Sequence, residues 1–87
     1  MKIALTHTRN PLMGWDISVS VSGEAAEAVA FVSIAVNDFP EVSETVDPPV
    51  GVYTHTLTQK GDYPGDNKVA VDVQDQDGNE HRALDVW

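Results

Sequence analysis

The chain has no cysteine, so its fold depends on no disulfide and it has no thiol nucleophile. Basic residues are few as well: five Lys and Arg against 14 Asp and Glu give a formal net charge of −9. Binding to phosphates needs clustered basic side chains, so this composition argues against a nucleic-acid partner. No apolar run approaches the ~20 residues of a membrane span, and we expect no membrane insertion.

The location of the protein stays open. The apolar start of the chain ends at Thr6, too early for a signal peptide. We expect an extracellular or cell-surface location if these residues come from a longer exported chain, and a cytoplasmic one if Met1 is the native start.

The residues that are abundant predict an all-β domain. Thirteen Val and six Thr against four Leu favour strands over helices, and 87 residues suffice for one domain with one core. Apolar and polar residues alternate with the period of half-buried strands. Seven strands are expected, at Lys2–Thr8, Trp15–Ser22, Ala28–Val36, Glu41–Val46, Val50–Thr58, Lys68–Asp75 and Glu80–Trp87. Turn residues separate them, including Asp47-Pro48-Pro49, and a loop with at most one helical turn is expected at Gly23–Ala30.

The alternation also predicts which side chains face the core. Trp15, Ile17, Val19 and Val21 share one face of their strand, and Val69, Val71 and Val73 share one face of theirs. In the third strand, Val32, Ile34 and Val36 are expected on one side, and Val29 and Phe31 on the other. Seven such strands at this spacing predict an antiparallel β-sandwich.

Several segments resemble bacterial immunoglobulin-like accessory domains. They are Val19-Ser-Val-Ser-Gly-Glu-Ala-Ala-Glu-Ala-Val29, Val32-Ser-Ile-Ala-Val-Asn37, Tyr53-Thr-His-Thr-Leu57, Gly65-Asp-Asn-Lys-Val-Ala-Val71 and Asp75-Gln-Asp-Gly-Asn79. The pattern is similar to that of the modules attached to glucodextranase-type and other cell-surface proteins. The resemblance implies a seven-stranded immunoglobulin-like sandwich that acts as a spacer, stalk or adhesion module, without catalysis. It covers about residues 15 to 80 and lacks the paired cysteines of antibody domains.

The connections of such a sandwich alternate between its two ends, and one end is expected to be acidic. It gathers Glu24, Glu27, Asp47, Asp75, Asp77 and Glu80 with no Lys or Arg. Among these we take Asp47, Asp75, Asp77 and Glu80 as candidate calcium ligands. The loop Asp75–Glu80 does not fit a helix–loop–helix calcium site, because Val73 would be the first ligand and Leu84 the last. A hairpin turn is the simpler interpretation.

The opposite end is expected to be partly apolar, with Leu12, Met13, Phe39 and Tyr63 as a candidate interface for a neighbouring domain, another copy or a protein partner. Arg9 and Lys60 lie beside it in the expected fold.

Two functions follow from these features. The first is a non-catalytic immunoglobulin-like structural or interaction module of a bacterial surface, secreted or virion protein. The alternative is a carbohydrate- or calcium-binding accessory domain that targets an attached enzyme, with Trp15, Tyr53, Tyr63 and Trp87 as candidate sugar-stacking residues. His7, His55 and His81 lie on three different strands without metal-ligand spacing, and a sandwich this small leaves little room for a catalytic cleft.

Overall fold

The structure is a computed structural model that describes residues 1–11, 14–23, 27–60 and 67–87. Seven antiparallel strands make up most of the chain: β1 (Lys2–Arg9), β2 (Gly14–Ser22), β3 (Val29–Val36), β4 (Phe39–Val50), β5 (Val52–Lys60), β6 (Lys68–Asp75) and β7 (Glu80–Val86). All but β4 begin and end within two residues of the positions predicted from the sequence. The all-β prediction is confirmed, while residues 24–26 of the expected helical turn lie outside the described residues.

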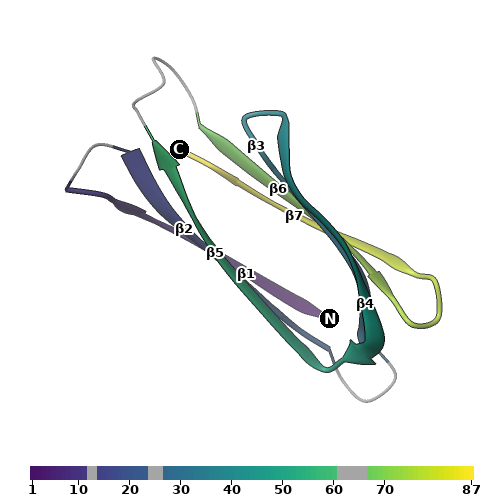
Figure 1. Cartoon of the computed structure of the whole chain (residues 1–87). Helices are drawn as coiled ribbons and strands as arrows, with labels where there is room; N and C mark the ends of the chain where they lie inside the picture. The colour runs from purple at the N-terminus through teal and green to yellow at the C-terminus, as the bar shows by residue number, and fades with distance from the viewer. Residues whose placement is uncertain (12–13, 24–26, 61–66) are drawn as a thin grey trace.

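The strands form two sheets, one of three strands in the order β1-β2-β5 and one of four in the order β4-β3-β6-β7. The sheets face each other as the two layers of a sandwich (Figure 1). The described residues form no helix able to span a membrane.

The core lies between the sheets and consists almost entirely of Val and Ile. Its fully buried members come from the inner strands, and they are Ile17, Val19 and Val21 on β2, Val29, Val32 and Ile34 on β3, and Val69, Val71 and Val73 on β6. Outward neighbours such as Ser18, Ser20 and Asp72 are exposed, so the predicted alternation of β2 and β6 is correct. Burying each Val or Ile contributes roughly 1.5–3 kcal/mol, which makes this cluster the main source of stability.

The prediction for Val29 was wrong. It is fully buried with Val32 and Ile34 rather than on the opposite side of β3. The register of β3 shifts between Val29 and Phe31 against both neighbouring strands, as a β-bulge does. The extra residue, Ala30, breaks the alternation, so Val29 returns to the core face.

The predicted turn at Asp47-Pro48-Pro49 is also wrong, because these residues belong to β4. Between the pairs Phe31↔Thr45 and Val29↔Val50, β4 has four residues where β3 has one, so the segment bulges away from its neighbour. Proline is tolerated there because β4 is an edge strand whose outer N–H groups need no partner. The chain reverses at Gly51 instead.

Two other turns follow the residue types that the sequence shows. Asn37 and Asp38 have φ angles of 50° and 69°, which is the backbone of a two-residue hairpin loop between β3 and β4. Gly78, at φ 87°, closes the turn between β6 and β7.

Hydrogen bonds between loops show which connections share an end. Gly23 N–H donates to the Gly51 carbonyl at 2.9 Å, and Gln76 N–H donates to the Ala28 carbonyl at 2.9 Å. These bonds join the β2–β3, β4–β5 and β6–β7 connections, and we call this end the acidic pole. At the other end, the opposite pole, Asn37 N–H donates to the Lys68 carbonyl at 2.8 Å. The predicted grouping of loops is therefore confirmed where the structure describes them.

Candidate functional site

Asp75 is the centre of a polar cluster at the acidic pole. It ends β6 with its side chain only 2% exposed. One carboxylate oxygen accepts the N–H groups of Asp77 at 2.9 Å and Asn79 at 3.0 Å, and the other lies 3.0 Å from Nε2 of His81. The hydrogen bond with His81 lowers the pKa of Asp75 below its usual value. Burial opposes this change, and the backbone N–H groups of Asn79 and Asp77 add to the lowering.

Glu27 joins this cluster from the β2–β3 connection. Its Oε2 lies 2.6 Å from the α-amino group of Met1, so the two form an ion pair. Donor atoms of Glu27, Asp75 and His81 lie within 4.8 Å of one another. Two carboxylates and an imidazole are ligands that a zinc-like ion takes.

The four predicted calcium ligands are arranged differently. Asp75 is part of the cluster, whereas Asp77 and Glu80 are exposed in and after the turn, and Asp47 lies in the bulged part of β4. Calcium takes six to eight oxygen ligands. The described cluster supplies three donors, one of them nitrogen, and each is already paired within the protein. Calcium binding through all four residues stays a prediction.

Phe39 is the described member of the predicted apolar interface at the opposite pole. It is 62% exposed where β4 leaves the hairpin. Leu12, Met13 and Tyr63 lie outside the described residues.

Two tryptophans at the opposite pole pack against each other and a histidine. The His7 ring stacks on Trp87 with centroids 4.0 Å apart, and Trp15 meets both rings edge-on. Nδ1 of His7 lies 2.7 Å from Oδ2 of Asp85, which ties β1 to β7 across the sandwich. Sugar stacking needs an open ring face, but one face of Trp87 is covered by His7, and the Arg9 guanidinium lies over Trp15 at 5.3 Å. The arrangement indicates a packed seam between two edge strands.

Tyr53 ties the other pair of edge strands together. Its hydroxyl on β5 donates to Oε2 of Glu44 on β4 at 2.9 Å. Burial and the neighbouring Glu44 carboxylate raise the pKa of Tyr53 to about 12. The hydroxyl therefore remains protonated and keeps this contact across the neutral pH range.

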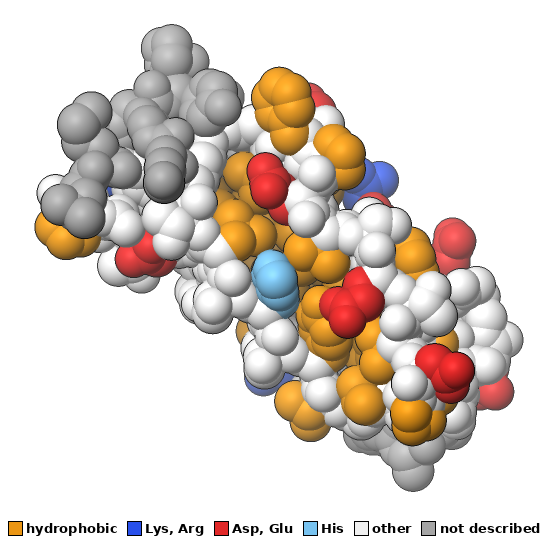
Figure 2. Space-filling view, viewed as in Figure 1, with side chains coloured by type: hydrophobic (Ala, Val, Ile, Leu, Met, Phe, Trp, Pro, Cys, Tyr) orange, Lys and Arg blue, Asp and Glu red, His pale blue; other side chains and the backbone are white. Residues whose placement is uncertain are grey.

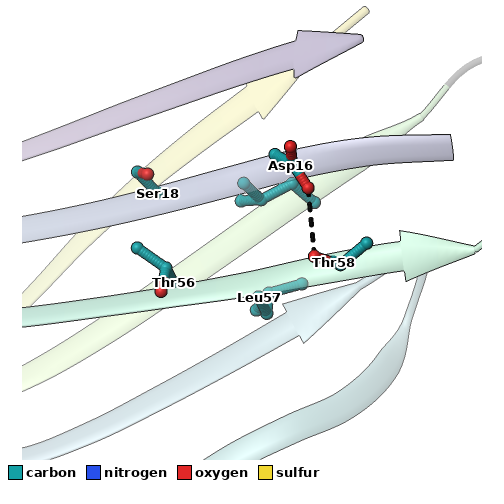
Figure 3. Close-up of a pocket in the computed structure, with 6 residues that line it drawn as sticks. Asp16, Ser18, Thr56, Leu57 and Thr58 are labelled. Atoms are coloured by element: carbon teal, nitrogen blue, oxygen red, sulfur yellow. Dashed lines mark hydrogen bonds between the residues drawn. The ribbon is translucent and has the colours of Figure 1, made fainter. Parts of the chain in front are cut away.

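The outer face of the three-stranded sheet is lined by hydroxyl groups. Directly paired positions bring together Thr6, Ser18 and Thr56 in one row, and Thr8, Asp16 and Thr58 in the next. An open depression of about 330 Å³ lies between β2 and β5 (Figure 3), and Thr58 donates to Asp16 across it at 3.0 Å. This face has the polar character of a sheet surface that stays in water.

The outer face of the four-stranded sheet differs. Direct pairing places Leu84, Ala70, Ala35 and Pro40 in one row across all four strands. Leu84 is 55% exposed, and Val86, two residues further along β7, is 57% exposed. We call these five residues the apolar row. The two alanines lie between Leu84 and Pro40 at the edges, and Ala70 is only 7% exposed.

Sequence reasoning missed the apolar row and two members of the polar cluster. The row could not be found without knowing which strands pair. His81 lies on the same inward-facing side of β7 as Asp85, and this alternation could have indicated that His81 points into the sandwich. Nothing in the sequence places the Met1 α-amino group beside Glu27. No family model, curated protein or solved structure matches the chain.

Proposed function

We propose that the chain is a non-catalytic, immunoglobulin-like interaction module of a surface, secreted or virion protein. In an immunoglobulin-like sandwich the first, second and fifth strands share one sheet, and the third, sixth and seventh share the other. The orders β1-β2-β5 and β3-β6-β7 agree with that scheme, with β4 added beside β3. This strand order supports the fold part of the proposal.

The apolar row is the observation that carries the interaction part. A sheet face in water normally carries polar side chains, as the hydroxyl-lined face of the same molecule does. Two large hydrophobic residues more than half exposed on a single strand are a feature of protein-binding surfaces. The preferred partner is therefore a protein or a neighbouring module with its own apolar surface.

Site-specific photo-crosslinking tests this proposal. A photoreactive phenylalanine at position 84 is compared with one at position 6 on the hydroxyl-lined face, in cells that express the protein. We expect a discrete adduct from position 84 that disappears when Val86 is also changed to Ser, and none from position 6. Equal labelling from both positions would show that the apolar row is not the contact surface.

A metal-binding accessory role is the second candidate, and the Glu27–Asp75–His81 cluster is the observation that favours it. Thermal melting with 1 mM Ca²⁺ or Zn²⁺ is the measurement, with a control at equal ionic strength. Since the donors are already paired within the protein, a metal ion would have to displace those partners, and an unchanged melting midpoint would contradict the metal-binding role. A rise that Asp75→Asn abolishes would establish a metal-binding role instead.

A further inference from the structure

The outer edge of β5 lacks the features that normally protect an edge strand. Natural edges are blocked by proline, charge, bulges or a covering segment. β5 has nine residues without proline or acidic side chains, and its pairing with β2 has no register shift. Its unpaired backbone groups therefore form a regular, nearly uncharged ladder.

The other three edges each carry such protection. β4 contains three prolines, three acidic residues and a bulge. β1 and β7 lie against each other, joined by the His7–Asp85 and His7–Trp87 contacts. Among the described edges, β5 carries the least such protection: its described hydrogen bond to the facing edge strand β4 is the one from Tyr53 to Glu44.

The sandwich also has space for a strand beside β5. One sheet has four strands and the other three, and their β1 and β7 edges are in contact. The three-stranded sheet is therefore one strand short on the side of β4 and β5, where a fourth strand next to β5 would face β4. Val42, Val46 and Leu57 on this side are only partly buried although they pack against the core. Figure 2 shows this side, with hydrophobic side chains visible between the sheets and acidic side chains beside them.

Charge indicates which segment fits. The acidic residues of β4, namely Glu41, Glu44 and Asp47, are exposed, and Glu44 reaches across to the Tyr53 hydroxyl of β5. Neither β4 nor the first eight residues of β5 include a Lys or Arg. The whole chain carries a net charge of −9. A second copy would bring the same negative charge, whereas a basic segment would be attracted.

We propose that β5 accepts an extended segment of a partner protein, with alternating apolar and basic residues, as the fourth strand of its sheet. Main-chain hydrogen bonds to β5 supply the binding, apolar side chains cover Leu57 and Val42, and basic side chains lie in the field of the β4 carboxylates. This surface is separate from the apolar row, so this proposal and the proposed function can fail independently.

The test uses a synthetic peptide, acetyl-Lys-Val-Thr-Val-Lys-Val-Thr-Val-Lys-amide, titrated into the isotope-labelled protein. Nuclear magnetic resonance shifts and hydrogen exchange report on every backbone amide. We expect shifts centred on β5 and at least tenfold slower exchange of its outward amides. An analogue with alternate peptide nitrogens methylated should bind at least tenfold more weakly, because it cannot complete the ladder.

Matched protein variants test the charge part. Glu41→Gln should lower the affinity of the protein for the peptide about two- to fivefold, the range for one exposed charge. Glu80→Gln on β7 is the matched control and should leave this affinity unchanged. Equal binding of the methylated analogue would overturn the proposal by showing charge attraction alone. Shifts centred away from β5, or a concentration-dependent dimer that protects β5 without peptide, would overturn it too.

Discussion

Replacing Val71 by Ala should destabilise the protein far more than replacing its neighbour Asp72. Val71 is 0% exposed on an inner strand, between Ile34 on β3 and Ala83 on β7. The substitution removes two methyl groups at about 0.8 kcal/mol each, and the cavity left behind brings the loss to about 2–3 kcal/mol. For a domain of this size, that loss lowers the melting temperature by roughly 10–20 °C.

Asp72→Ala is the matched control, one residue along the same strand. Asp72 is exposed and its ion pair with Arg82 has a long 3.6 Å contact between exposed side chains, so the loss should stay within about 0.5 kcal/mol. Urea unfolding monitored by circular dichroism measures both variants, and an unchanged slope shows that stability alone has changed. Comparable losses at the two positions would refute the assignment of the inward face.

Three further outcomes are expected. Gly23→Ala should lower the free energy of unfolding in urea by about 1–3 kcal/mol, because a Cβ there would collide with the Glu27 carbonyl oxygen. Gly51→Ala is the control and should be neutral or slightly stabilising, because a Cβ there meets open space. Equal effects of the two substitutions would contradict the close approach of Gly23 to Glu27. The pKa of Asp75 is lowered in the folded state, so its contribution to stability is present above its unfolded pKa near 4 and is lost as pH falls through the lower folded value. Asp75→Asn should therefore make the free energy of unfolding fall less steeply as the solution is acidified. In a Tyr63→Phe background, absorbance titration should place the remaining tyrosine, Tyr53, near pKa 12, and an unshifted value near 10 would contradict its contact with β4.

The strands were predictable where burial alternates regularly. On β2 each buried Val or Ile is followed by an exposed residue. On β6 Ala70 interrupts the alternation, because it is only 7% exposed although it lies between the core residues Val69 and Val71. The period of two still assigned Val69, Val71 and Val73 to the core correctly. The Asn37-Asp38 and Asp77-Gly78 turns were readable because few residues tolerate a positive φ. These signals are local, and so they are present in the sequence itself.

The errors fall where pairing between distant strands decides the outcome. A bulge at Ala30 reverses the side on which Val29 lies, and it is seen in the pairing of β3 with both β4 and β6. The Asp47-Pro48-Pro49 stretch has the composition of a turn, but an edge position lets it continue as strand. The apolar row depends in the same way on the order of four strands, so composition alone could not show it.

The positions of the two termini have a mechanical consequence. The N-terminus lies toward one end of the long axis and the C-terminus toward the other (Figure 1), and the molecule measures 40 × 20 × 18 Å. A pull on the termini therefore acts along β1, whose pairing with β2 runs without interruption from Lys2↔Ser22 to Arg9↔Trp15. The hydrogen bonds of that ladder are loaded together in shear rather than opened one after another. Forced unfolding is governed by the unfolding rate, so the domain should extend abruptly at a single high force and resist tension better than its modest core suggests.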